Sequence, residues 1–465
     1  MISTSLKYYF HVILIPFLIL GGLLCVNHRS CAQELSLDSC LNLARNNNYN
    51  LSRSELAVER AKQVKNAALS YYFPQVQISA MAYHSLQPPI NVAIEDLNNE
   101  NVRNTLQFIY DNFGSTLGIS NTLQLFQYGT IAGITAIQPV FMGGKIVEGN
   151  KLAQVGVDAA KLQYEIQERD VLEDVEASYW LCVGLEDKLE TVEAVASLLD
   201  TLSHIVDAAV EAGLALPTDK MEVQLKQNEL TRTKLQLTNG MSLARQALGQ
   251  AIGISISDSV LLIEPLDSTL ALLPQTDVLP DINDLSPESN LLALQVQAAR
   301  LRRDMAIAEA LPQVAIGANY GYSHLDTKEL TNGLGGWNGA LFVTVNVPLT
   351  AWWGAAHKIK ENKLQMEDAE LQQKDMNEKL HLRVQQAFDQ MVESMLMVNS
   401  AESSVETASE NYRLITAAYE SGMKSITDLL QAQSMYLKAK NDLTDARIAL
   451  RVHARRYIDL TQQIY

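Results

Sequence analysis

The feature that most constrains this chain is a short motif that occurs twice, Glu-x-Gly followed by four residues and then Thr-Asp. It runs from Glu211 to Asp219 and again from Glu420 to Asp428. A glycine just past a helical run adopts the left-handed conformation without strain, and Thr-Asp is typical of a helix cap and an acidic first turn. Each copy therefore predicts a tight turn between two antiparallel helices, so the chain contains two helical hairpins.

Long segments almost free of proline flank both turns. Residues 143–212 and 351–421 each predict a helix of about 105 Å, and the return helices, 217–251 and 425–460, are about 50 Å long. The last helix has an apolar seam with spacings of three and four, formed by Leu429, Ala432, Tyr436, Ala439, Leu443, Ala446 and Leu450. This seam indicates coiled-coil packing with close helix contacts.

Two strands precede each hairpin, and they repeat as well. Pro-Gln-Val occurs at the start of both copies, and apolar residues then alternate with small or polar ones. We expect strands at about 73–83, 131–140, 312–322 and 339–349. The alternation fits transmembrane barrel strands, but a half-buried strand of a soluble sheet gives the same pattern.

The chain is therefore predicted to consist of two repeats, residues 33–253 and 286–465. In each repeat a helix, over 36–69 or 286–310, comes before the strands. The first repeat carries an insertion from Ser85 to about residue 129, which is rich in asparagine and predicts a long loop between two strands on the side away from the helices. Residues 254–285, interrupted by prolines, predict an irregular linker.

The N-terminus has the pattern of an export signal over residues 1–32. Lys7 precedes an apolar run, and Ser30-x-Ala32 offers a cleavage site. A lipoprotein acylated at Cys25 or Cys31 is the alternative, although neither cysteine has a good lipobox. Cys40 and Cys182 remain after cleavage. They could pair in an oxidising compartment, but two separate buried residues are the simpler interpretation because both fall in predicted helices far apart in sequence.

Charge and motifs argue against nucleic-acid binding and catalysis. The net charge is −17, whereas a phosphate binder needs a basic face. Metal-ligand spacing, a phosphate-binding loop and a nucleophile elbow are all missing from the sequence. The glycine-rich stretch Gly333–Gly339 is broken by Asn338 and predicts a loop between strands, and His453 predicts a packed or surface residue. We expect no enzyme activity, cofactor or metal.

Aromatic residues gather where the predicted strands join the helices. They are Tyr71, Tyr72 and Phe73 before the first strand, Phe141 after the second, and Trp352 and Trp353 after the fourth. Such clusters are expected at a membrane interface. Four strands cannot close a barrel, and open edges are not tolerated in lipid, so the chain must then form an oligomer. The strand count alone allows a dimer with eight strands or a trimer with twelve.

The order helix, strand, strand, long helix, glycine turn and return helix, written twice, resembles the TolC-like outer membrane efflux proteins. The motif QPVFMGG after the second strand and the two turns carry this resemblance over nearly all of the mature chain. It implies a mainly α fold with a small β part: a trimer with a twelve-stranded outer membrane barrel and an α-helical periplasmic tunnel. It also implies that the protein is the exit duct of a tripartite efflux or type I secretion system in a Gram-negative bacterium, with a periplasmic adaptor and an inner-membrane pump as partners.

The resemblance also implies roles for the turns, which would form the closed periplasmic mouth. By position Asp219 resembles an acceptor on the first hairpin, and Tyr419 and Lys424 resemble its partners on the second; Lys424 replaces the arginine of the best-known member. Asp428 matches an acidic ring, and Gln431 stands where a second aspartate ring would be. The turn residues implied in adaptor contact are Gly213, Leu214, Thr218, Gly422, Met423 and Thr427. The simpler reading is that Asp219 and Asp428 only stabilise helix N-termini.

Two other functions compete with the exit duct. One is a periplasmic coiled-coil adaptor, although adaptors have one hairpin and β-rich domains whereas this chain has two hairpins and four strands. The other is an all-α periplasmic enzyme, for which the sequence offers no motif. The transported substrate is not readable from the sequence, because the pump selects it.

Overall fold

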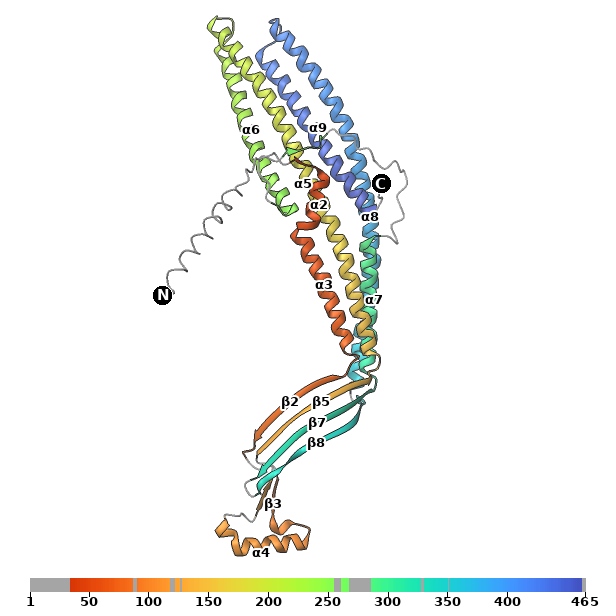
Figure 1. Ribbon diagram of the computed structural model, residues 1–465. Helices are drawn as coiled ribbons and strands as arrows, with labels where there is room; N and C mark the ends of the chain where they lie inside the picture. Colours follow the sequence, from red (N-terminus) through yellow and green to blue (C-terminus); the bar gives the residue numbers. More distant parts are fainter. Residues whose placement is uncertain are drawn as a thin grey trace, which may run out of the picture. The chain divides into compact units, whose positions relative to one another are not determined.

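The computed structural model describes residues 34–86, 90–117, 122–125, 128–254, 261–266, 286–327, 330–349 and 351–461. These residues form two units (Figure 1). The first contains the described residues up to 54, within 165–286 and from 379 onward; the second contains those within 55–164 and 287–378. The predicted export signal lies outside the described residues.

The first unit is built around two helical hairpins (Figure 1). The first hairpin is formed by α5 (Lys145–Glu211) and α6 (Pro217–Ile252), and the second by α8 (Ala351–Glu420) and α9 (Ile426–Thr461). The seam predicted for α9 is largely inside: five of its members are buried, namely Leu429, Ala432, Ala439, Leu443 and Leu450. The mainly helical fold is confirmed, and packing along this seam explains why such long helices are stable.

A second apolar core joins α5 and α6 to the short helix α2 (Leu37–Asn47). Its largest side chains, Tyr179 and Trp180, are fully or almost fully buried and meet edge to face, with ring centroids 5.4 Å apart. The Arg451 guanidinium lies 3.9 Å from the Trp180 ring centroid, as a cation–π pair. Cys40 and Cys182 are both buried in this core and both are free thiols, and burial raises the pKa of each to about 11.

The single helix expected over residues 36–69 is wrong, because the chain breaks at Asn48. The Asn48 Oδ1 accepts the backbone N–H groups of Asn50 at 2.8 Å and Leu51 at 3.3 Å, which caps a new helix, α3 (Tyr49–Ser70). The Asn48 Nδ2 donates to the Ala251 carbonyl at 2.7 Å. One buried amide therefore ends α2, starts α3 and ties both to the end of α6.

The linker expected over residues 254–285 is not wholly irregular. Its described part contains the short strand β6 (Leu261–Leu262), which pairs in parallel with β1 (Glu34–Leu35). The rest of that expectation, at 255–260 and 267–285, lies outside the described residues.

The second unit contains a four-stranded antiparallel sheet with the order β2-β5-β7-β8 (Figure 1). The strands are β2 (Gln75–His84), β5 (Tyr128–Phe141), β7 (Gln313–Thr327) and β8 (Leu330–Asn346). The stretch Gly333–Gly339, expected as a loop, belongs to β8. In this stretch Gly339 pairs with Tyr320 of β7.

The register gives the sheet two different faces, since paired residues share a face and neighbours along a strand alternate. One face is mostly apolar and exposed, with polar exceptions at Gln138 near the helices and at His84, Thr130 and His324 toward the other end of the strands; its larger apolar members are Val76, Ile78, Ile134, Ile316, Tyr320, Trp337, Leu341, Val343 and Val345. The other face is mostly polar or glycine, with Ile131, Ile137 and Phe342 among Gln75, Gln77, Ser79, Thr135, Gly317, Asn319, Gly321 and Thr344.

Two glycines redirect the chain from β5 into α5. Gly143 and Gly144 have φ of 65° and 95°, values that favour glycine. A Cβ at Gly143 would also overlap the carbonyl oxygen of Ala308 in α7 (Pro287–Glu309). Two residues later, the ion pair between Lys145 Nζ and Glu309 Oε1, at 2.7 Å, joins the start of α5 to the end of α7. This is the local reason for the glycines in QPVFMGG.

The insertion between β2 and β5 is more than the long loop expected, because it has secondary structure of its own. It contains β3 (Ile90–Ala93) paired with β4 (Thr122–Leu125), and the helix α4 (Glu100–Leu117) between them. The Asn99 Oδ1 starts α4 by accepting the N–H groups of Asn101 at 3.1 Å and Val102 at 3.3 Å. The asparagines taken for loop residues therefore include a helix cap.

Candidate functional site at the two hairpin ends

Both hairpins end in the same backbone motif. Gly213 and Gly422 have φ of 72° and 76°. The Leu214 N–H donates to the Ala209 carbonyl at 2.8 Å, and the Met423 N–H donates to the Ala418 carbonyl at the same distance. These bonds, with those from the two glycine N–H groups to the carbonyls three residues back, form a Schellman cap at each helix end. The repeated glycine is therefore a conformational requirement of each turn.

The residue after each glycine is a large apolar side chain in solvent. Leu214 is 85% exposed and Met423 is 76% exposed. Apolar residues of this exposure at the two equivalent positions give the hairpin ends a matched pair of apolar contacts for another surface.

The Thr-Asp pairs start the return helices, but the threonines do not cap them. The Asp428 Oδ2 accepts the Ser425 N–H at 3.1 Å while the Ser425 Oγ accepts the Asp428 N–H at 3.2 Å, which is a capping box. In the first copy the Asp219 Oδ2 accepts the Leu216 N–H at 3.1 Å. The expectation that Thr218 is a helix cap is wrong, because Pro217 already occupies the first helical position.

The two aspartates share this helix-start geometry, but their charged partners differ. Lys424 Nζ lies 3.6 Å from Asp428 Oδ1, within the same turn. Hydrogen bonds from the Ser425 N–H and then its hydroxyl lower the pKa of Asp428, with Lys424 adding to the effect. Burial, and then the negative charge of Asp219, raise the pKa of the Tyr419 hydroxyl. Asp219 thus acts on Tyr419 through its field, while Lys424 is engaged by Asp428.

A direct link between the hairpins involves a residue that the sequence did not single out. The Thr427 Oγ1 donates to the Glu222 Oε2 at 2.8 Å, joining the first turn of α9 to the second turn of α6. Below it lies an apolar core that both hairpins share, formed by Val192, Val195, Leu199, Val206, Val223, Leu230, Ile426, Leu429 and Leu430. The position of Glu222, one helical turn after Asp219 on α6, was the available signal.

The remaining predicted residues lie as follows. Gln431 and Thr218 are exposed on their helices. Five aromatic residues expected at the interface have exposed side chains, namely Tyr71, Tyr72, Phe73, Phe141 and Trp353; the side chain of Trp352 lies outside the described part. His453 Nδ1 is 2.6 Å from the Ser394 hydroxyl, between α9 and α8, so it is a packed helix residue.

Within the described ranges, three or more histidine, cysteine or acidic side chains never gather in a way that could hold a metal ion. Among the helices of those same ranges, none combines the length and apolar character that a membrane span requires.

Comparisons with known proteins find similarity to outer membrane efflux proteins and outer membrane channels. Residues 286–456 match the family model of outer membrane efflux proteins. The fold resembles the CmeC outer membrane channel of Campylobacter jejuni, with a TM-score of 0.72 and 15% identity over 91% of this chain and 85% of that one. It also resembles the outer membrane protein VceC of Vibrio cholerae, with a TM-score of 0.71 and 14% identity over 91% and 95% of the two chains.

A third solved structure is the MtrE outer membrane channel of Neisseria gonorrhoeae, with a TM-score of 0.71 and 14% identity over 91% of this chain and 88% of that one. No curated protein matches the sequence significantly. The sequence is thus similar to the outer membrane efflux proteins over residues 286–456, and the fold resembles these solved structures over 91% of the chain.

Proposed function

We propose that the chain is the exit duct of a tripartite efflux or type I secretion system in the outer membrane of a Gram-negative bacterium. The observation that carries this proposal is the four-stranded sheet with one apolar face and one polar face. A sheet face covered with exposed valine, isoleucine and leucine suits lipid, and the glycine-rich polar face suits a water-filled lumen. The exposed aromatics around Tyr72 and Trp353 fit the interface at the helix-proximal ends of the strands.

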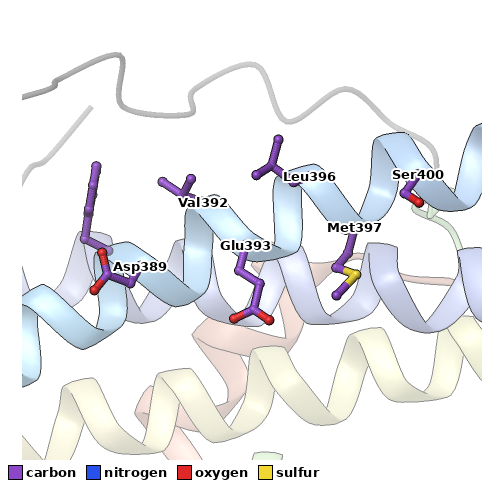
Figure 2. Close-up of a pocket in the computed structure, with 7 residues that line it drawn as sticks. Asp389, Val392, Glu393, Leu396, Met397 and Ser400 are labelled. Atoms are coloured by element: carbon purple, nitrogen blue, oxygen red, sulfur yellow. The ribbon is translucent and has the colours of Figure 1, made fainter.

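The functional unit is a homotrimer. One chain supplies four strands, so three chains supply the twelve of a closed barrel, which leaves no edge exposed to lipid. The helices also retain apolar surface for a second copy. Figure 2 shows Val392 and Leu396 projecting from α8 on the side away from the helices behind it, along a shallow groove. Leu396 and Met397 are more than half exposed.

The hairpin ends are the contact for a periplasmic adaptor, through which the duct meets an inner-membrane pump. Leu214 and Met423 supply apolar contacts, and the glycines Gly213 and Gly422 keep both turns narrow. Thr218 and Thr427 lie on the first turns of the return helices and complete the adaptor surface.

Gating belongs to the same ends. Asp219, Tyr419, Lys424 and Asp428 provide charge and hydrogen-bonding capacity around the mouth, Gln431 lowers its negative charge, and the Thr427–Glu222 hydrogen bond holds the hairpins together. The link is exposed, so it is worth about 1 kcal/mol and adaptor contact is enough to break it.

Membrane fractionation combined with planar-bilayer recording tests this function. The full chain, expressed with its own export signal, is expected in the outer membrane fraction, and the purified protein is expected to form ion-conducting pores. A periplasmic adaptor would instead fractionate as a soluble or inner-membrane-associated protein and would not conduct, which would contradict the proposal.

A further inference from the structure

We infer that β8 of one chain pairs with β2 of a second copy in one defined register, in which Ser79, Met81 and Tyr83 lie opposite Asn346, Thr344 and Phe342 of the neighbour. This inference rests on the proposed oligomeric channel and adds to it the residue pairs that close the wall. It is drawn from the register of the strands within one chain.

The two strand pairs within the repeats have the same register. In the first repeat Gln75 pairs with Ile137, and in the second Gln313 pairs with Asn346. Gln75 and Gln313 are equivalent repeat positions, both in Pro-Gln-Val. Ile137 and Asn346 are also equivalent, because each lies two residues before the proline that ends its strand pattern, Pro139 or Pro348. The internal repeat is therefore kept to the residue in the sheet.

The pair between the repeats, β5 with β7, shows how one repeat joins the next. Thr135 pairs with Asn319, and Gly133 pairs with Gly321. Ala80 pairs with Ala132, which in turn pairs with Tyr322. The residue of the second repeat that is equivalent to Ala80 is Ala318, four residues before Tyr322. Each repeat is thus staggered by four residues against the one before it. A constant stagger from repeat to repeat is what closure into a barrel requires.

Beyond the second repeat, the described sheet ends at β8, as it begins at β2. If the next repeat follows with the same stagger, it is the first repeat of another chain. The pair Thr135–Asn319 between the repeats of one chain then has an equivalent between chains: Thr344 is the repeat equivalent of Thr135, and Met81 is that of Asn319. Met81 therefore faces Thr344 of the neighbouring chain. The same step gives Ser79 with Asn346 and Tyr83 with Phe342.

The two faces of the sheet provide an independent check of this register. Met81, Ser79 and Tyr83 lie on the mostly polar face, as do Thr344, Asn346 and Phe342. The apolar face likewise stays continuous, with Ala80 opposite Val345. A slip of one residue would turn every apolar side chain of the neighbour toward the lumen, so the face pattern excludes it.

The register also distinguishes the strand junction between chains, here called a seam, from the equivalent β5–β7 seam within a chain. At the β5–β7 seam Gly133 faces Gly321, whereas at the seam between chains Tyr83 faces Phe342. Each ring packs over a glycine of the adjacent strand: a Cβ built at Gly317 would overlap the Phe342 ring, and one at Gly129 would overlap the Tyr83 ring. Three aromatic pairs therefore line the lumen of a trimer at its chain-to-chain seams.

Cysteine cross-linking tests the register on the full-length protein in outer membranes. A Cβ built on Gly133 would lie 3.1 Å from the Cα of Gly321, so lumen-facing pairs at these seams are the closely spaced kind that a disulfide can bridge. Met81→Cys with Thr344→Cys is expected to shift the protein, after mild oxidation, from the monomer band to reducible dimer and trimer bands on denaturing gels. The single variants are expected to stay monomeric.

Matched pairs make the test specific. Thr135→Cys with Asn319→Cys, the equivalent pair within the chain, is expected to form a disulfide without any covalent oligomer. Gln77→Cys with Thr344→Cys is four residues out of register, about 13 Å along the strand, and is expected not to cross-link. Stronger oligomer bands from Met81→Cys with Phe342→Cys or Asn346→Cys would overturn the register. Native mass spectrometry of the same variants distinguishes a wrong register from a wrong proposed function. A trimer in which Met81→Cys and Thr344→Cys do not cross-link contradicts only the register, whereas a monomer contradicts the proposed function.

Discussion

At the scale of single residues, the hairpin ends combine two demands on the same side chains. Asp428 stabilises the first turn of α9 through Ser425, and it also holds Lys424 at 3.6 Å. Asp219 does the first of these for α6 and also raises the pKa of Tyr419 by its charge. Helix capping and a charged mouth are therefore compatible, and neither interpretation of the repeated Thr-Asp excludes the other.

Glu222 is predicted to matter for closure of the mouth. Glu222→Ala removes the acceptor of the Thr427 hydrogen bond, so the closed state loses about 1 kcal/mol per chain. Single-channel recordings are expected to show a higher mean conductance. Glu222→Gln keeps an acceptor oxygen and is the matched control, expected to conduct like the wild type. An alanine variant with unchanged conductance would show that this hydrogen bond does not hold the mouth closed.

Asp428 is predicted to give the channel part of its cation preference. Because hydrogen bonds from Ser425 lower its pKa, the carboxylate stays charged to a lower pH than an ordinary aspartate, whose pKa is about 3.9. Reversal potentials at pH 7 are expected to show weaker cation preference for Asp428→Asn than for the wild type. The difference should persist until the pH falls below about 3.9. A difference lost already near pH 5 would contradict the depressed pKa.

The same hydrogen bonds predict the acid stability of the first turn of α9. A depressed carboxyl pKa stabilises the folded turn above the unfolded pKa, and this contribution is lost as the pH falls through the folded pKa. The sign follows from the ionised form being the one that accepts the Ser425 N–H.

At the scale of elements, periodicity predicted the helices and strands well, and local polar contacts were harder to read. The glycine turns at Gly213 and Gly422 and the seam of α9 follow directly from residue type and spacing. The break at Asn48 does not, because it depends on the Ala251 carbonyl two hundred residues away. In the same way, Asn99 looks like a loop residue in sequence and becomes a helix cap only when α4 has formed.

Asn48 is accordingly predicted to be important for stability. Asn48→Ala leaves the Ala251 carbonyl without this donor and uncaps α3, at a cost of about 2 kcal/mol. Thermal unfolding of the purified protein is expected at a lower temperature. The control is Asn46→Ala, since Asn46 is exposed and its amide donates to the Asn42 carbonyl of its own helix. Equal unfolding temperatures for the two variants would contradict the role of Asn48.

The insertion carrying α4 is predicted to face the cell exterior, because it joins β2 and β5 at the ends away from α3 and α5. Asn104→Cys on the exposed side of α4 is expected to react with a membrane-impermeant maleimide on intact cells. Asn228→Cys, exposed on α6, is expected to react only after the outer membrane is permeabilised. Labelling of both residues, or of neither, on intact cells would place the insertion differently.

At the scale of the whole molecule, a single chain leaves surfaces that require a partner. Its sheet has two edges and an apolar face, and its hairpins leave apolar residues such as Leu396 in solvent. Sequence could predict that the chain needs partners, since four strands cannot close. The number of chains followed only from family resemblance, because strand count permits eight or twelve.

Native mass spectrometry of the protein extracted from outer membranes in detergent tests whether it is a trimeric outer membrane channel. A particle of three processed chains that persists at low protein concentration is expected. A stable monomer as the main species, from a preparation with intact secondary structure, would contradict it.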